Sequence, residues 1–131
     1  MIRILRFSLI VTLVVLAACQ TAPSVTVEDL SGIWELDGSA RILQLNEDGT
    51  FRIANSKYLL EDSPVNVGKF QLEGTLFTLT DSEESRFCPG DTGTYEVELT
   101  EEGKLQFTLN EDECPYRGRF LSSAPWSRFL P

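Results

Sequence analysis

The segment RILQLNEDGTFRI, residues 41–53, decides the fold. Apolar and polar residues alternate on both sides of an Asp-Gly pair, which is typical of two antiparallel strands joined by a tight turn. Leu43 and Leu45 before the turn, and Phe51 and Ile53 after it, would face the same side of a sheet. The segment therefore predicts a β-hairpin with one buried face.

The same alternation continues to the C-terminal end, and no segment shows a persuasive helical period. The predicted strands are residues 32–37, 41–46, 49–54, 67–73, 75–80, 93–99, 104–109 and 115–121. Eight short antiparallel strands indicate an all-β fold, either an up-and-down barrel or a sandwich. We expect the small eight-stranded barrel, because closure leaves no exposed strand edge.

The N-terminal region has the layout of a secretory signal peptide. An apolar run from Phe7 to Ala18 follows Arg3 and Arg6, and its twelve residues are fewer than the roughly 20 that a membrane-spanning helix needs. We expect a signal helix over residues 1–18, a flexible tether over 19–29 and one barrel domain over 30–131.

The end of that run, Leu16 to Cys19, resembles the lipobox of bacterial lipoproteins. The resemblance implies that Cys19 is acylated at sulfur and becomes the first residue of the mature protein. It implies three acyl chains, and stable anchoring takes at least two. Gln20 is not Asp, so the resemblance implies the outer membrane, facing the periplasm, in a two-membrane bacterium. In a single-membrane organism it implies the outer face of the cytoplasmic membrane.

Acylation of Cys19 would explain the odd number of cysteines, which is three. Cys88 and Cys114 then remain as a pair in an oxidising compartment, so we expect a disulfide between them. It would close a loop of about 27 residues and stabilise the domain by about 3.5 kcal/mol in the chain-entropy model. A redox-active or metal-binding pair is the alternative, but the CxxC spacing and a histidine partner are both absent.

The composition narrows the classes of function. The chain carries 20 acidic and 11 basic residues, for a net charge of −9, and removal of residues 1–18 makes the charge more negative still. We therefore expect no nucleic-acid partner. Histidine is absent, which removes the commonest general base and metal ligand. We expect neither an enzyme nor a bound metal or cofactor, and we interpret the acidic runs as solvated turns rather than calcium loops.

The first predicted strand carries a motif, Gly32-x-Trp34, that resembles the G-x-W of lipocalins and related calycins. In that family the tryptophan closes one end of the barrel beneath an arginine from the final strand. The resemblance implies that Arg117 or Arg119 takes this place, and Arg128 is a further candidate.

The C-terminal third resembles a group of small bacterial lipocalin-like domains of unassigned activity. The matching residues are Cys88, Gly90, Gly93, Tyr95, Asp112, Cys114, Arg117 and Trp126. Asp112 and Arg117 could form a polar site, although such a pair more often holds a loop beside a disulfide. The short chain and short strands depart from a full-length lipocalin and imply a shallow barrel.

Two functions remain open from the sequence. The first is a membrane-anchored binder of a small apolar or amphipathic ligand, with Arg41 pointing inward and a pocket lined by aromatic residues. The alternative is an envelope interaction module or inhibitor with a filled core, whose rim loops, Asn55–Val67 and Asp81–Gly93, contact a partner protein. The aromatic candidates for the pocket, which would otherwise form the core, are Phe51, Phe70, Phe77, Tyr95, Phe107 and Phe120.

The anchoring prediction can be tested with Cys19→Ser. Without the thiol no acyl chain can be attached at this position, so the variant should leave the membrane fraction and lack the mass of the lipid. Fractionation and mass spectrometry measure both properties. Retention of the variant in the membrane at the wild-type level would contradict acylation at Cys19.

Overall fold

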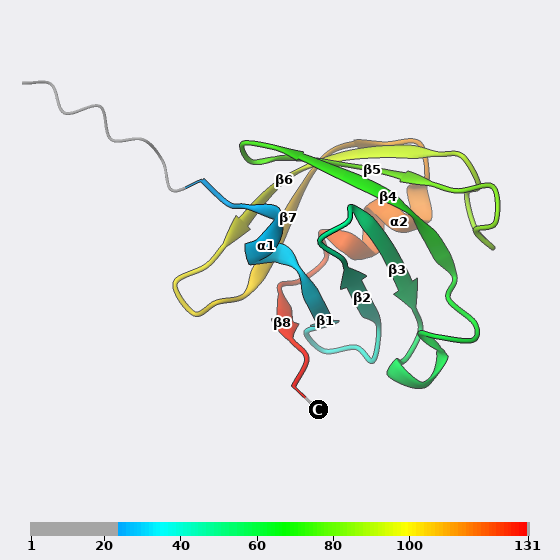
Figure 1. Cartoon of the computed structure of the whole chain (residues 1–131), viewed down its shortest axis with the longest axis horizontal. Coiled ribbons are helices and arrows are strands. Elements are labelled where there is room, and N and C mark those ends of the chain that lie inside the picture. Colours follow the sequence, from blue (N-terminus) through cyan, green and yellow to red (C-terminus); the bar gives the residue numbers. More distant parts are fainter. Residues whose placement is uncertain (1–23, 131) are drawn as a thin grey trace, which may run out of the picture.

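The strands follow one another around a closed antiparallel barrel, because β1 pairs with β8 as well as with β2 (Figure 1). This is a computed structural model that describes residues 24–130. The all-β up-and-down barrel is therefore confirmed, and the expected signal helix and Cys19 lie outside the described residues. The strands are β1 (Gly32–Leu36), β2 (Ile42–Leu45), β3 (Thr50–Ala54), β4 (Asn66–Glu73), β5 (Leu76–Asp81), β6 (Thr92–Leu99), β7 (Leu105–Asp112) and β8 (Trp126–Arg128).

The hairpin of β2 and β3 forms in the predicted register. Leu45 pairs with Phe51 and Leu43 with Ile53, and all four side chains are buried. Gly49 occupies the turn with a φ of 84°, a conformation that costs glycine little and other residues more. The Asp-Gly pair therefore placed this turn correctly.

Two short helices and a 3₁₀ turn accompany the strands. Helix α1 (Val27–Leu30) begins at a capping box on Thr26 and buries Leu30; it lies across the expected boundary between tether and barrel. The 3₁₀ turn η1 (Lys57–Leu59) lies between β3 and β4. No helix within residues 24–130 has the length and apolar character needed to cross a bilayer.

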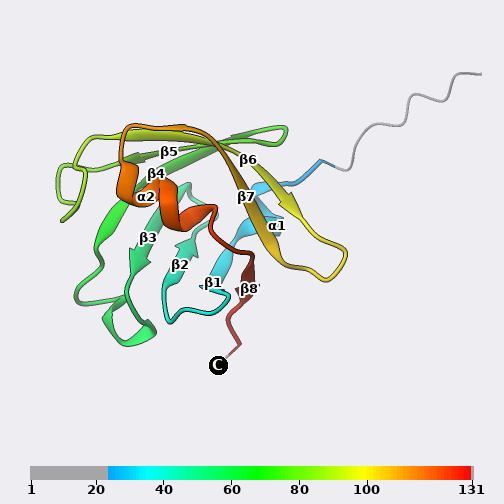
Figure 2. The same cartoon turned by 180° about the vertical axis from the view of Figure 1, so that it is seen from behind.

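The predicted strand over 115–121 is wrong, because this segment forms helix α2 (Pro115–Leu121). Pro115 occupies the start of the helix, where its missing N–H costs nothing. Seen from behind, α2 lies across the barrel (Figure 2). Its buried residues recur at helical spacing: Arg117, Gly118, Phe120 and Leu121.

The eighth strand instead comes from residues after α2. Trp126 of β8 pairs with Leu36 of β1 and with Leu105 of β7, which closes the barrel. Its ring is fully buried, and its indole Nε1 donates to the carbonyl of Leu121 at 3.0 Å. One large aromatic side chain therefore joins α2 to both neighbouring strands.

Arg128 of β8, not Arg117 or Arg119, covers the tryptophan of the G-x-W motif. Its guanidinium lies 4.3 Å from the centre of the Trp34 ring and donates to the carbonyls of Ser31 and Asp29, both at 2.9 Å. The expected assignment to Arg117 or Arg119 is wrong because it placed the final strand at 115–121. Arg128 lies on β8, the final strand of the structure.

Two physical constraints require glycine at position 32 of the motif. Gly32 has a φ of 134°, which side-chain-bearing residues rarely adopt. A Cβ atom at this position would also lie 2.7 Å from Nη1 of Arg128. Gly32 therefore makes room for the arginine that covers Trp34.

Aromatic side chains fill the barrel interior. Phe77 stacks on Phe70 and meets Phe107 edge-on, both at 5.2 Å between ring centres. Tyr95 meets Phe107 edge-on at 5.8 Å. These rings belong to one continuous core that also includes Phe51, and each is at most 4% exposed. They contribute to stability as packed core side chains.

The role of Arg128 can be tested against a neighbouring arginine. Arg128→Ala removes the cation–π contact and two hydrogen bonds, so we expect a loss of roughly 1–2 kcal/mol. That loss should lower the Tm by several degrees in a domain of this size. Arg119→Ala, at an exposed position of α2, is the control and should change the Tm little. Equal Tm values for the two variants would contradict the role of Arg128.

Candidate functional site

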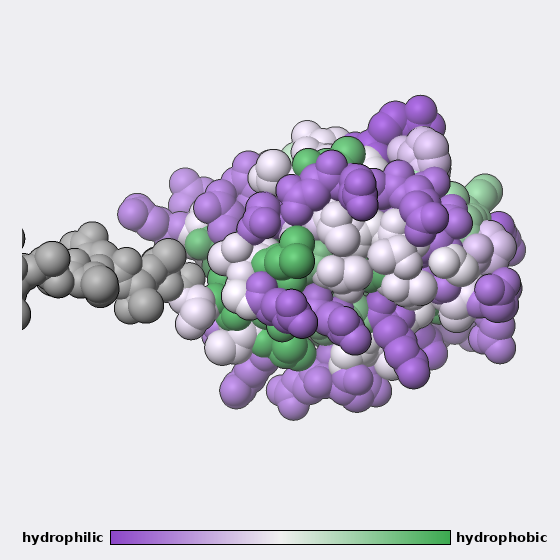
Figure 3. All heavy atoms as spheres, turned by 90° about the horizontal axis from the view of Figure 1, so that it is seen from above, coloured by the Kyte–Doolittle hydropathy of each residue, from purple (hydrophilic) through white to green (hydrophobic). Residues whose placement is uncertain are grey.

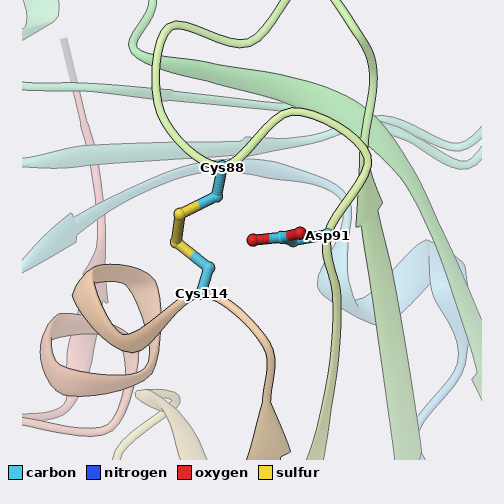
Figure 4. Close-up of side chains that lie close together, drawn as sticks. All are labelled: Cys88, Asp91 and Cys114. Atoms are coloured by element: carbon cyan, nitrogen blue, oxygen red, sulfur yellow. A yellow bond between two sulfur atoms is a disulfide. The ribbon is translucent and has the colours of Figure 1, made fainter.

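The expected disulfide is present and joins a loop to a helix. Cys88 in the loop after β5 bonds to Cys114, the residue that precedes α2, with an S–S distance of 2.03 Å. The Asp91 carboxylate lies beside the bond (Figure 4). One of its oxygen atoms and the two sulfur atoms lie within 4.8 Å of one another. Because the two sulfur atoms are bonded to each other, neither offers a thiolate to a metal ion.

Beneath the disulfide lies a buried cluster of charged and polar side chains, which we call the Arg117 cluster. Arg117 is fully buried. Its Nε donates to Oδ2 of Asp112 at 2.8 Å, and its Nη2 donates to Oδ1 at 2.7 Å. This is the bidentate geometry that makes arginine–carboxylate pairs strong. The cluster consists of Arg117, Asp112, Asp81, Tyr95 and Asn66.

A second carboxylate binds the other side of the guanidinium. Nη1 of Arg117 donates to Oδ1 of Asp81 at 2.5 Å. The side-chain amide of Asn66 donates to Oδ2 of Asp81 and, at 3.0 Å, to the carbonyl of Phe87. Asp81 ends β5 and Asn66 begins β4, so the cluster fixes the point where both strands meet the loop of residues 82–91.

Asp112 accepts more hydrogen bonds than Asp81. Besides both bonds from Arg117, it accepts the hydroxyl of Tyr95 on Oδ2 and the backbone N–H of Cys114 on Oδ1 at 2.8 Å. Two donors therefore reach each oxygen. Both oxygen atoms of Asp112 must accept hydrogen bonds, so this side of the cluster requires an ionised carboxylate and not an amide.

Burial shifts the ionisation of the cluster. Desolvation raises the pKa of Asp81 above its usual value, although Asn66 and Arg117 favour the ionised form. Burial and the adjacent Asp112 also raise the pKa of Tyr95, which keeps the phenol protonated. For Arg117, burial works against the charge, but Asp112 and Asp81 outweigh it and raise the pKa.

Gly93 makes room for the Asp112 carboxylate. A Cβ atom on Gly93 would overlap both carboxylate oxygens of Asp112. A Cβ atom on Gly118 would lie at ordinary contact distance, 3.4 Å from Cβ of Asp112, where α2 packs on β7. The glycine of the motif before Tyr95 therefore serves the cluster rather than a turn.

The Arg117 cluster holds structure together rather than meeting a substrate. The side chains of Arg117 and Asp81 are 0% exposed, and that of Asp112 is 1% exposed. The interpretation that Asp112 and Arg117 hold a loop beside the disulfide agrees with these contacts. Sequence reasoning missed Asp81 and Asn66, because nothing in their local sequence distinguishes them from other strand-end polar residues.

The residues expected to line a ligand pocket are distributed differently. The five aromatic candidates on the strands lie in the packed core described above. Arg41 is half-buried at the rim rather than in the interior. Its guanidinium lies 4.2 Å from the Phe120 ring centre and donates to the hydroxyl of Tyr116 at 2.8 Å. Arg41 therefore packs against α2.

The expected rim loops lie side by side on the outer surface. Arg86 N donates to the carbonyl of Val65 at 3.0 Å, and Val67 N donates to Oγ of Ser85 at 2.9 Å. A groove of about 890 Å³ runs between these loops over the outer face of β2, β3 and β4. We call it the loop groove; its charged lining includes Arg52, Lys69, Arg86, Glu61, Asp62 and Glu84.

Two basic residues of the loop groove are free of ion pairs. Within residues 24–130, Lys69 and Arg86 make no salt bridge, and Arg52 reaches Glu61 only at 3.5 Å between exposed side chains. Elsewhere in these residues, Lys104 and Arg117 form salt bridges, and Arg41, Lys57 and Arg128 lie over aromatic rings. The groove lining also contains Asp48, Glu61, Asp62 and Glu84, so it presents charges of both signs, and Lys69 and Arg86 are its two unpaired basic groups within the described part of the chain.

Comparison with known proteins gives no match: no protein-family model, no curated protein and no solved structure matches this chain.

The two aspartates of the Arg117 cluster should respond differently to the same substitution. Asp112→Asn replaces one acceptor oxygen by an NH₂ group that faces hydrogen-bond donors in the core. We therefore expect the free energy of unfolding to fall by roughly 3–5 kcal/mol. Asp81→Asn removes one acceptor but also a buried charge, so its cost should be at least about 1.5 kcal/mol smaller. Denaturant unfolding at pH 7 measures both. Equal losses would contradict the division of roles within the cluster.

The pH dependence supplies a check on the same pair. Because the folded-state pKa of Asp81 is raised, its contribution to stability is greatest below the unfolded-state value and is lost as pH rises through the folded-state pKa. The difference in unfolding free energy between wild type and Asp81→Asn should therefore shift in favour of the wild type as pH falls. A difference that stays constant with pH would contradict the raised pKa.

Proposed function

We propose that this chain is a lipid-anchored barrel of the cell envelope that works as a protein-interaction module, with the loop groove as its contact surface. The anchor is the acylated Cys19 implied by the lipobox, and the expected place is the outer membrane facing the periplasm. The barrel is the rigid support that positions two loops. The proposal concerns binding, and no chemical step is assigned.

The observation that carries the proposal is the contrast between the interior and the outer surface. Core side chains occupy the interior positions where a ligand would sit, with Phe51 and Tyr95 at 1% and 0% exposure. The large hollow lies outside, between the loops. A small apolar or amphipathic ligand, the first function expected from the sequence, would therefore have to bind outside this interior.

The position of the groove suits a tethered protein. The described chain starts at one end of the molecule, whereas the loops of residues 55–65 and 82–91 project from the opposite end in both views (Figures 1 and 2). Four residues lie between Cys19 and Ser24, so the five steps from one to the other allow at most roughly 18 Å of extended chain. A membrane anchor at Cys19 would thus keep the start of the barrel near the bilayer and direct the loop groove away from it.

The chemistry of the groove favours a partner protein with charges of both signs. Lys69 and Arg86 would meet carboxylates, and the acidic side chains of the same groove would meet basic groups. Tyr58, on η1 beside the groove residues 61–64, is 91% exposed. Tyrosine is among the residues that most often dominate binding energy at protein interfaces. The partner would therefore contact the groove and the adjacent η1 turn together.

Site-specific photo-crosslinking in cells tests this surface. A photoreactive amino acid at Tyr58 or Glu84 should give a discrete crosslinked product, and the same amino acid at Gln106, on the outer face of β7, should not. Lys69→Glu with Arg86→Glu should weaken the product at least tenfold. Arg119→Glu, which reverses one charge elsewhere, should leave it unchanged.

Two results would contradict the proposal. One is identical products from the groove positions and from Gln106, which would indicate random collision. The other is full retention of the product in the double charge-reversal variant, provided that its Tm matches the wild type.

A further inference from the structure

A second hollow, which we call the apolar hollow, lies at the end of the barrel where the described chain begins. It has a volume of about 420 Å³, within the range of small-molecule sites. Hydrophobic residues are visible at the surface in this part of the molecule, bordered by hydrophilic ones (Figure 3). The hollow is lined by Val25, Asp29, Thr75, Val97, Glu98 and Leu99, with Ser24 at its edge.

The floor of the hollow is continuous with the barrel core. Val97 is 2% exposed and belongs to the core cluster. Val25 and Leu99 are partly buried and pack against the same cluster. The backbone N–H of Val97 donates to the carbonyl of Thr75 at 2.9 Å, which fixes the wall between β6 and the β4–β5 turn. The apolar surface is therefore held in place before any ligand binds.

The charged groups in the lining are both acidic. The carboxylate of Asp29 is held by the backbone N–H of Thr26 at 3.0 Å, and this hydrogen bonding lowers its pKa. Glu98 is exposed and forms no ion pair within residues 24–130. A nearby basic side chain, Arg128, is engaged with Trp34 and with backbone carbonyls, including that of Asp29. Arg128 is not part of the lining and keeps its positive charge, because its partners are neutral. The charged side chains that line the hollow itself, Asp29 and Glu98, are both negative above an apolar floor.

We propose that the apolar hollow binds a cationic amphiphile, with its alkyl chain on Val25, Val97 and Leu99 and its ammonium group between Asp29 and Glu98. Charge complementarity selects this ligand class, because a fatty acid or another anionic amphiphile would place like charges together. The site lies at the opposite end of the barrel from the loop groove, so it is independent of the proposed protein interaction.

Binding of dodecyltrimethylammonium and dodecyl sulfate, each below its micelle-forming concentration, tests the proposal. These probes share one alkyl chain and differ in the sign of the head group. The protein is residues 20–131, which contain every helix, strand and disulfide of the structure. Amide chemical shifts locate the site, and we expect saturable changes at Thr75, Val97, Glu98 and Leu99 with the cationic probe. The anionic probe should bind at least tenfold more weakly.

Charge reversal at the rim supplies the matched control. Glu98→Lys should weaken the cationic probe at least tenfold and narrow or invert the preference between the probes. Glu111→Lys, at an exposed position of β7, makes the same change in net charge away from the hollow and should leave both affinities unchanged. Because both variants alter exposed residues, their folds should match the wild type by the same spectra.

Three outcomes would overturn the inference. Shift changes outside the hollow would place binding elsewhere. Equal affinity for the two probes would show a site for any alkyl chain, without charge selection. In acylated full-length protein, shifts at the same four residues that added cationic probe cannot displace would identify an acyl chain of Cys19 as the occupant.

Discussion

The structure depends on one guanidinium group buried beneath a disulfide. Arg117 reaches from α2 to Asp112 at the end of β7 and to Asp81 at the end of β5. A buried charge is tolerated only when partners surround it, so α2 can lie across the barrel only in the position that satisfies all these bonds. The disulfide Cys88–Cys114 holds the loop and the start of α2 above the same point. Covalent and ionic contacts thus close one side of a barrel whose last strand contributes only three residues.

Closing the barrel in this way leaves the outer surface as the place for the binding that we propose. Helix α2 contributes Phe120 and Leu121 to the core, and together with the aromatic residues of the strands they occupy the interior. The outer surface offers two different chemistries at opposite ends. The loop groove combines basic and acidic side chains between loops, whereas the apolar hollow combines an apolar floor with carboxylates. A barrel with a filled interior is rigid. Rigidity would favour the two proposed interactions, because few side chains and loops would have to become ordered on binding.

The hairpins were predictable because their information is local. Alternation with period two, together with Asp-Gly or another glycine at the turn, specifies both the strand and its neighbour, and β2 with β3 shows this clearly. Helix α2 was not predictable in this way. Tyr116, Gly118 and Phe120 alternate as they would in a strand, and Gly118 weakens a helical pattern. The signal for a helix was Pro115, which favours the first helical turn and has no N–H for a strand ladder.

The amino-acid sequence by itself determined the all-β class, seven of the strands, the pairing of Cys88 with Cys114 and the association of Asp112 with Arg117. The fold class and the strands depend on periodicity and on turn residues. The disulfide follows from the number of cysteines, and Asp112 and Arg117 are close in the chain. Only the tertiary structure decided that Asp81 shares Arg117, 36 positions away, and that Arg128 covers Trp34. It also decided that aromatic rings fill the barrel. Those contacts join residues distant in sequence, and they depend on how a closed barrel and one helix place side chains in three dimensions.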